Sequence, residues 1–236
     1  MNLQNHSLSI IVPVYNEEKT LLSILKKIEI IKEVCEIEII IVNDGSTDNT
    51  KKIINENNNL YNKVIHLVKN SGKGKAVIEG IKKSSKDYIL IQDADLEYDP
   101  KDILVFLEEN KKFNYDLIMG SRFIGTRRTV LHFWHMIGNR FITFIFNLIN
   151  NTTFSDIYCC YCMFKRNLIK VDELKCYNWG QQAEILTYLI QKNSKIYEIG
   201  INYHGRSYKE GKKIKYYNVF SVIYWILYTR IKKIFI

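Results

Sequence analysis

The sequence predicts an α/β protein with a mostly parallel central β-sheet flanked by helices. Short β-branched runs alternate with helix-like segments from Leu8 to Gly120, which is typical of βαβ units. Polar clusters follow these runs, and parallel sheets bind ligands beyond the carboxyl ends of their strands. The chain of 236 residues is 47% hydrophobic, which suits one large domain, or one domain with an appendage, around a substantial core.

The expected strands are short runs of Ile, Val and Leu at residues 8–14, 38–42, 63–68, 88–92 and 116–120. Between them, apolar side chains recur at helical spacing in residues 19–31, 50–58, 72–83 and 102–111. Asp99 and Pro100 favour the start of the last of these helices, because Asp caps a first turn and Pro is tolerated within it.

Beyond residue 122 the regular alternation ends. Residues 130–149 form a long apolar and aromatic segment, interrupted by Gly138-Asn139. The later expected elements are a helix over residues 181–191, a strand over 195–201, a basic loop with glycines over 203–214 and a terminal helix over 216–236. No apolar run reaches the roughly 18 residues of a membrane span, but residues 141–149 and 219–229 are long enough to lie on a bilayer.

Charge and cysteine usage narrow the class of protein. The net charge of +9 suits an anionic partner, such as a nucleotide, a nucleic acid or an anionic membrane. The cysteines are odd in number, and residues 1–8 do not read as a secretory signal, so we expect free thiols in a reducing compartment. Cys159, Cys160 and Cys162 lack a CxxC-type spacing and a fourth ligand, which disfavours a zinc site.

An acidic stretch follows the strand expected at residues 88–92. Asp93, Asp95, Glu97 and Asp99 repel one another there, and a bound cation is the usual remedy. Carboxylate oxygens suit Mg²⁺ or Mn²⁺, which bind one or two such groups together with substrate phosphates. The stretch therefore indicates a metal site, with a solvated acidic loop as the alternative.

Two common nucleotide-binding motifs are absent. Ser71-Gly-Lys-Gly-Lys-Ala76 is like part of a P-loop, but Lys69 stands where a P-loop has Gly, and Ala76 where it has Ser or Thr. No GxGxxG follows the first strand, so a dinucleotide cofactor is not expected. We expect Gly72 and Gly74 instead to let the backbone turn tightly into a helix near a bound phosphate.

Short motifs along the chain carry a family resemblance. They are Val12-Pro-Val-Tyr-Asn-Glu17, Val42-Asn-Asp-Gly-Ser46, Gly72-Lys-Gly74, Asp93-Ala-Asp95, Gly120-Ser-Arg122, Ser155-Asp156, Glu184 and the basic segment 206–213. In this order and spacing they resemble a family-2 glycosyltransferase of the GT-A fold, from Ser9 to about Arg230. The resemblance is closest to the dolichol-phosphate mannose synthases and glucosyltransferases and their bacterial polyprenyl-phosphate relatives.

The resemblance implies roles for particular residues. The nucleotide-sugar site would contain Pro13, Tyr15, Asn16, Glu17, Val42, Asp44, Asp93, Ala94, Asp95, Arg122, Arg206 and Lys212. Asp95 and Glu97 would ligate Mg²⁺ or Mn²⁺, Arg122 would meet phosphate, and Arg206 and Lys212 would close over the donor diphosphate. The catalytic set would be Asp93, Asp95, Arg122, Asp156 and Arg206. Asn43 replaces an Asp that is common in the family, but Asp44 remains. The chain departs more at the acceptor end, around Asp156, where Cys162 stands in place of the Lys that relatives tend to carry.

The implied reaction transfers a hexose from a UDP- or GDP-sugar to a polyprenyl phosphate, dolichyl or undecaprenyl, with inversion. The enzyme would sit in the cytoplasm, peripherally at the cytoplasmic face of a membrane, and a membrane-protein partner is compatible with that place. Residues 1–214 would form the GT-A domain, and residues 215–236 an amphipathic helix on the membrane surface. Its stripe of Tyr216, Phe220, Ile223, Leu227 and Ile231 could alternatively pack on the domain's own core.

Other functions remain as alternatives. Transfer to a saccharide or another hydroxyl would need a general base, for which Asp156 and Glu184 are the candidates. A phosphate acceptor is already an anion and needs no base, so on the main reading Arg122 should matter more than either acid, with Arg127, Arg128 and Arg140 as further cations. A sugar-1-phosphate nucleotidyltransferase would want a Gly-rich loop after the first strand. A nucleic-acid-binding module would need no acids at strand ends, so no nucleic-acid partner is expected.

Overall fold

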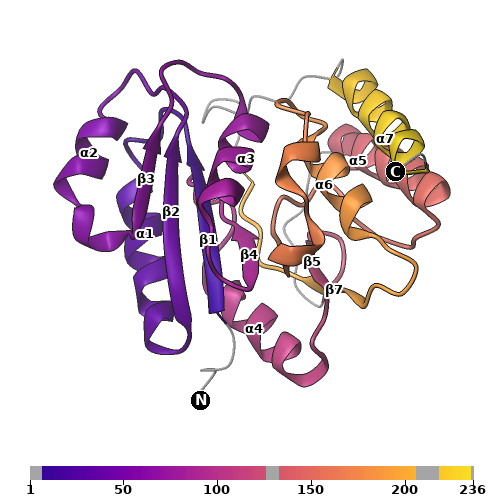
Figure 1. Ribbon diagram of the computed structural model, residues 1–236, viewed down its shortest axis with the longest axis horizontal. Helices are drawn as coiled ribbons and strands as arrows, with labels where there is room; N and C mark the ends of the chain where they lie inside the picture. Colours follow the sequence, from indigo (N-terminus) through magenta and orange to yellow (C-terminus); the bar gives the residue numbers. More distant parts are fainter. Residues whose placement is uncertain (1–6, 126–132, 206–217, 235–236) are drawn as a thin grey trace.

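A seven-stranded sheet forms the centre of the computed structural model, which describes residues 7–125, 133–205 and 218–234 (Figure 1). The strands are β1 (Ser7–Val14), β2 (Glu36–Asn43), β3 (Lys63–His66), β4 (Tyr88–Ile91), β5 (Leu117–Ser121), β6 (Cys162–Lys165) and β7 (Ile196–Gly200). Their order is β3-β2-β1-β4-β6-β5-β7. Only β6 runs antiparallel to its neighbours, β4 and β5, so the prediction of a mostly parallel sheet is confirmed.

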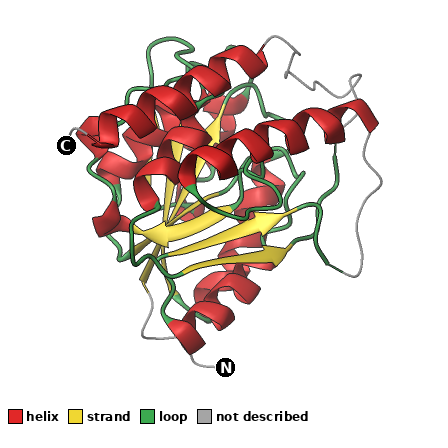
Figure 2. Cartoon of the chain, turned by 90° about the vertical axis from the view of Figure 1, so that its right-hand side faces the viewer, coloured by secondary structure: helices red, strands yellow, loops and turns green. Residues whose placement is uncertain are grey.

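Helices cover both faces of this sheet (Figures 1 and 2). They are α1 (Leu21–Glu29), α2 (Thr50–Glu56), α3 (Lys73–Lys83), α4 (Asp102–Phe113), α5 (Phe133–Asn150), α6 (Gln181–Leu189) and α7 (Asn218–Ile234). Short 3-10 turns occupy Ile30–Glu33, Asn58–Leu60, Arg166–Leu168 and Val171–Glu173. The two long helices that lie side by side in Figure 2 are α5 and α7, which contact each other. Among the described residues, no helix is long and apolar enough to span a membrane.

The predicted elements of the first half match the structure to within a few residues at their ends. The second half holds two differences. Strand β6 was not predicted, and Cys162 belongs to it, whereas Cys159 and Cys160 precede it. Cys159 and Cys162 are buried, Cys160 is partly exposed, and all three thiols are free. The interruption predicted at Gly138-Asn139 is wrong, because α5 continues through both residues.

A buried carboxylate fastens the edge of the sheet opposite the polar clusters. Glu38 of β2 accepts hydrogen bonds from the Ser9 hydroxyl at 2.7 Å and from the amide and hydroxyl of Ser85, both at 2.9 Å. Lys63 of β3 lies 2.5 Å from its other side. Burial favours the neutral acid, but Lys63 and these hydrogen bonds outweigh it and lower the pKa of Glu38 from 4.5 to about 2.

This arrangement predicts a pH-dependent contribution to stability. Because the folded pKa lies below the unfolded one, Glu38 stabilises the fold above about pH 4.5, and the contribution is lost as the pH falls towards 2. Glu38→Gln is expected to lower the free energy of unfolding at pH 7 by about 1–3 kcal/mol. Urea unfolding of both proteins from pH 7 to pH 3 measures this. A difference between them that stays constant over that range would contradict the account.

Candidate active site

One large cavity, of about 1010 Å³, lies at the carboxyl ends of β1, β2 and β4 and extends to α5 and α7. The structure brings four of the predicted polar clusters to it, and they contribute Tyr15 and Glu17, Asp44, Asp93 to Glu97, and Arg122. The opposite wall is largely aromatic and apolar, although the amide side chains of Asn139, Asn178, Gln181 and Gln182 also line it. It contains Trp134, His135, Gly138 and Ile142 of α5, Tyr158, Tyr177, Trp179 and, from α7, Asn218 and Val219. The cavity therefore has a polar, acidic half and an aromatic half.

The acidic half is a tight turn after β4. Leu96 takes a left-handed conformation, with φ of +62°, which a non-glycine residue adopts only where its surroundings hold it. The turn directs the Asp95 carboxylate back to the Glu97 amide, at 3.1 Å. Buried Gln92 braces it from below by donating hydrogen bonds to the carbonyl oxygens of Asp93 and Tyr98. The acids are thus fixed by backbone geometry at the edge of the cavity.

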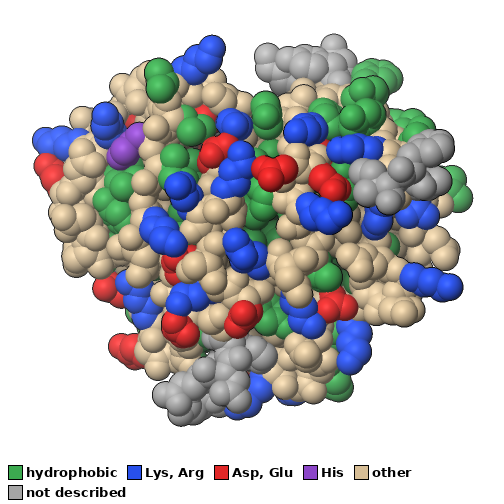
Figure 3. Space-filling view, in the orientation of Figure 1, with side chains coloured by type: hydrophobic (Ala, Val, Ile, Leu, Met, Phe, Trp, Pro, Cys, Tyr) green, Lys and Arg blue, Asp and Glu red, His purple; other side chains and the backbone are tan. Residues whose placement is uncertain are grey.

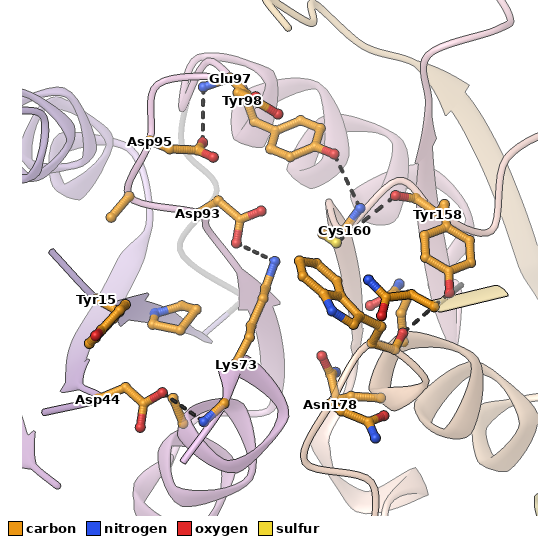
Figure 4. A pocket seen from close by; sticks show the side chains of 18 of the residues that line it. Tyr15, Asp44, Lys73, Asp93, Asp95, Glu97, Tyr98, Tyr158, Cys160 and Asn178 are labelled. Carbon is orange, nitrogen blue, oxygen red and sulfur yellow. Dashed lines mark hydrogen bonds and ion pairs between the residues drawn. The ribbon is translucent and has the colours of Figure 1, made fainter. Parts of the chain in front are cut away.

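A lysine from α3 reaches this turn. Lys73 Nζ lies 2.5 Å from Asp93 Oδ1, and Figure 4 shows its side chain pointing to that carboxylate. Burial opposes the positive charge, but Asp93 and Asp95 outweigh it and raise the pKa of the Lys73 ammonium group. Lys73 belongs to the Gly72-Lys-Gly74 motif, whose glycines alone suggested a role, so this contact was not predicted from the sequence.

The turn is also tied to the segment that enters the basic loop. The Tyr203 hydroxyl donates to Glu97 Oε2 at 2.8 Å, and the His204 amide donates to the Glu97 carbonyl at 2.9 Å. Tyr98 and Tyr203 form a β-bridge. Arg206 and Lys212, predicted to close over the donor, lie outside the described residues, as do Arg127 and Arg128.

The entrance to α3 does not match its prediction in full. Gly72 has a φ of +95°, so the expected tight turn is present. However, the Ser71 and Gly72 amides donate to Asp44, at 2.8 and 2.9 Å, and the Gly74 amide donates to the Tyr177 carbonyl at 3.1 Å. A Cβ on Gly72 would lie 2.4 Å from that same carbonyl. The glycines therefore let the backbone at Tyr177 pack closely against the start of α3. The amides of Ser71, Gly72 and Gly74 donate to protein oxygens and are not directed at a phosphate.

Arg122, at the end of β5, is held by Asp156. Its Nε and Nη2 donate to the two carboxylate oxygens at 2.7 and 2.8 Å, and its amide donates to Oδ2 at 3.2 Å. Burial opposes the guanidinium charge, but Asp156 outweighs it and raises the pKa of Arg122. The Tyr203 ring lies 5.2 Å from the guanidinium carbon. Arg122 lines the cavity as predicted, but two of its five guanidinium N–H donors are directed at a protein carboxylate.

The two candidate bases, Asp156 and Glu184, do not line the cavity. Asp156 is 0% exposed, and both of its oxygens accept from Arg122. Glu184 is 1% exposed and accepts from the amides of Lys175 and Cys176, both at 2.9 Å. Burial raises the pKa of Glu184 despite those hydrogen bonds. The first acid positions Arg122, and the second positions the loop that carries Tyr177.

Two predicted nucleotide-site residues also lie away from the cavity. The Val42 side chain is 0% exposed within the core, so it is not placed to contact a ligand. Asn16 is exposed, and its Oδ1 accepts from the Thr47 amide at 2.8 Å, joining the loops after β1 and β2. Pro13, Tyr15, Glu17, Asp44 and Ala94 do line the cavity.

The acid pair fits a divalent metal that is completed by substrate. Within the described residues, no group of three or more His, Cys, Asp and Glu side chains could hold a metal by itself. The predicted metal ligands, Asp95 and Glu97, both line the cavity, and Asp93 lies there with further hard oxygen donors. Mg²⁺ and Mn²⁺ at nucleotide sites use one or two carboxylates and complete their shell with phosphate oxygens and water, so two acids suffice.

A parallel sheet with an acid pair at its strand ends, beside a cavity of this size, is the architecture of nucleotide-sugar glycosyltransferases. A family model described as glycosyl transferase family 2 matches residues 9–171. The chain belongs to glycosyl transferase family 2, and the protein is a glycosyltransferase.

Similar proteins agree with this family. The chain is 31% identical to an uncharacterised protein of Methanocaldococcus jannaschii over 86% of this chain and 93% of that protein. It is 35% identical to the dolichol-phosphate mannosyltransferase of Pyrococcus furiosus, over 49% of this chain and 33% of that one. It is 28% identical to the undecaprenyl-phosphate 4-deoxy-4-formamido-L-arabinose transferase of Proteus mirabilis, over 88% of this chain and 63% of that one. The chain thus spans a third to two thirds of the length of the two characterised relatives.

A solved structure shows the same fold. The glucosyl-3-phosphoglycerate synthase of Mycobacterium tuberculosis, crystallised with Mn²⁺, UDP and phosphoglyceric acid, superimposes with a TM-score of 0.69 at 17% identity. The match covers 95% of this chain and 78% of that one. Together with the sheet described above, it confirms the predicted GT-A fold.

Proposed function

We propose that the protein transfers a hexose from a UDP- or GDP-sugar to a polyprenyl phosphate, with inversion and with Mg²⁺ or Mn²⁺. The observation that carries this proposal is the division of the cavity into an acidic half and an aromatic half. A nucleotide diphosphate needs polar groups and a counter-cation, whereas an isoprenoid chain needs an apolar wall. The names of the Pyrococcus and Proteus relatives support the same acceptor class.

The donor would occupy the acidic half. Tyr15, Glu17 and Asp44 would bind the nucleoside end, and Asp93 and Asp95 would hold the metal beside the diphosphate. When bound, the metal would neutralise charge that develops on the leaving diphosphate. Glu97 already accepts from Tyr203, so it would contribute chiefly by holding the turn. Arg206 and Lys212 would approach the diphosphate from the loop that follows Tyr203.

The acceptor would need no protein base. The second pKa of a phosphate monoester is about 6, so its oxygen is an anion at neutral pH. The engagement of Asp156 with Arg122, and of Glu184 with backbone amides, supports this mechanism. A hydroxyl acceptor would require a carboxylate or histidine within hydrogen-bond reach. Neither buried acid is placed to serve, which leaves His135 of the cavity wall as the base that such an acceptor would use.

The acceptor would reach the cavity from a membrane surface. Helix α7 buries Val222, Ile226 and Thr229 against the domain, while Phe220, Leu227 and Ile231 of the predicted stripe are 76%, 44% and 54% exposed. The exposure of these three residues supports the membrane-surface interpretation of the stripe over packing on the core. On α5, Trp134, Phe144 and Leu148 are likewise exposed. Hydrophobic side chains gather at the upper right in Figure 3, over α7, and the cavity reaches both helices.

We expect this surface to bind lipid. The triple variant Phe220→Glu, Leu227→Glu and Ile231→Glu should lose at least about ten-fold in binding to anionic vesicles, because each change places a charge on the apolar face. The matched control is Ile30→Glu, Val68→Glu and Phe113→Glu, three exposed apolar residues on other elements. Flotation with phosphatidylglycerol-containing vesicles measures binding. Equal losses in the two triple variants would contradict a specific lipid face on α7.

A donor and acceptor screen tests the proposed function itself. Purified protein is incubated with Mg²⁺ or Mn²⁺, with radiolabelled UDP- and GDP-hexoses, and with a short polyprenyl phosphate, its alcohol or a saccharide. We expect label to move only to the phosphate. Transfer to the alcohol or the saccharide, with the phosphate inactive, would favour a hydroxyl-acceptor glycosyltransferase instead.

A further inference from the structure

We infer that Lys73 is an internal cation that keeps Asp93 from binding metal until a nucleotide diphosphate arrives, so that metal and nucleotide bind as a coupled pair. The inference rests on the proposed donor site. Its central observation is the 2.5 Å contact between Lys73 Nζ and Asp93 Oδ1. Asp93 is the first carboxylate of the proposed metal turn, so the ammonium group already occupies one of the few oxygens available to a metal.

The position of the pair indicates a functional contact rather than a packing one. Both side chains line the cavity, with 31% exposure for Lys73 and 17% for Asp93. The structure holds a useful contrast in Lys63 and Glu38, which are also 2.5 Å apart. Glu38 is fastened by Ser9 and Ser85 as well, and that pair does not line the cavity. Lys73, by contrast, makes its contact where the ligand must bind.

Lys73 and a divalent metal cannot both contact Asp93 without electrostatic repulsion between them. A divalent ion on the acid turn would lie close to the ammonium group, and like charges at such a distance repel strongly in a partly buried site. The lysine stem is flexible, so the ammonium can leave if another anion takes it. A diphosphate supplies that anion, and it also supplies the phosphate oxygens that complete the shell of the metal.

The arrangement therefore couples two binding events. A metal that binds alone must break the ion pair of Lys73 and Asp93, and the ammonium group gains no new anion in return. When diphosphate binds with the metal, the ammonium group moves from the Asp93 carboxylate to a phosphate oxygen. Because such coupling is reciprocal, metal should tighten nucleotide binding by the same factor by which nucleotide tightens metal binding. In Figure 4, Lys73 lies between Asp93, which it contacts, and the side of the cavity that carries Tyr15 and Asp44.

The test measures Mn²⁺ binding by electron paramagnetic resonance, with no acceptor and no turnover. Wild type, Lys73→Met and Lys73→Arg are each titrated with Mn²⁺ alone and with Mn²⁺ plus saturating UDP or GDP. We expect Lys73→Met to bind Mn²⁺ alone at least ten-fold more tightly than wild type, and to lose most of the enhancement by nucleotide. Lys73→Arg keeps the cation and should behave like wild type. Lys82→Met is the matched control, since it removes the same charge from the exposed end of α3 and should change nothing.

The outcomes separate this inference from the proposed function. If wild type binds Mn²⁺ more tightly with nucleotide, but Lys73→Met has unchanged or weaker affinity for Mn²⁺ alone, Lys73 does not guard Asp93 and the inference is overturned. If wild type binds no Mn²⁺ with either nucleotide, the proposed donor site itself fails. Thermal melts followed by circular dichroism check that each variant is folded under the conditions of the Mn²⁺ titrations.

Discussion

Asp95→Ala is expected to lower turnover by about 10³-fold or more, because it removes a carboxylate from the proposed metal turn and leaves the diphosphate charge uncompensated. Asp95 lines the cavity and is set there by the left-handed Leu96. Chelation of wild type should have a comparable effect, which added Mg²⁺ or Mn²⁺ reverses. Initial rates of label transfer at saturating donor measure both effects.

Asp99→Ala is the matched control for this prediction. Asp99 belongs to the same acidic stretch, but it does not line the cavity and instead lies 3.7 Å from Lys27. It should retain turnover within about three-fold, since an exposed ion pair contributes little. Wild-type activity that survives thorough chelation, or equal losses in the two variants, would contradict a metal role for the turn.

Breaking the pair of Arg122 and Asp156 is expected to have the largest effect on stability. Either Arg122→Met or Asp156→Asn should cost about 3–5 kcal/mol, because each leaves a buried group without its partner. That is a large share of the 5–15 kcal/mol that holds a typical domain folded. The double variant Arg122→Met with Asp156→Asn should cost less than the sum of the two single changes. Urea unfolding of the four proteins gives the coupling directly.

The same pair revises an expectation from the sequence. On the base-free mechanism, Arg122 was expected to matter far more than Asp156, because a phosphate acceptor needs a cation rather than a general base. With both carboxylate oxygens of Asp156 directed at Arg122, the two changes should be similarly damaging to the fold. An Asp156→Asn protein that unfolds like wild type, yet has lost transfer with donor binding intact, would contradict the positioning role and restore Asp156 as a candidate base.

Local patterns in the sequence predicted the first half of the fold well. Strands β1, β2 and β4 are buried runs of Ile, Val and Leu. The alternation of strands and helices in the sequence is enough to predict that such runs lie in the middle of a sheet covered by helices. The same rule brings Tyr15, Asp44 and Asp93 together, because parallel strands end at one edge of a sheet. The convergence of the polar clusters was therefore predictable without any knowledge of tertiary contacts.

The features that were not predicted depend on partners far away in the chain. Strand β6 pairs with β4 and β5, which precede it by more than forty residues, and its four-residue run has no alternation of its own. Asp156 and Glu184 were interpreted as possible bases because no local sequence pattern identifies their partners. Asp156 binds Arg122, and Glu184 accepts from the amides of Lys175 and Cys176. Helix α7 carries two apolar faces, and only packing decides which one is buried.

The central claim is that the acceptor attacks as a phosphate anion, with no protein base. The most direct test is the pH dependence of kcat/KM with two acceptors of the same chain length, a polyprenyl phosphate and its more acidic difluoromethylphosphonate analogue. The acid limb should fall near the second pKa of each acceptor, about 6 for the phosphate and lower for the analogue. An acid limb that stays at one pH for both acceptors would mean that an enzyme group must lose its proton first, and would contradict the account.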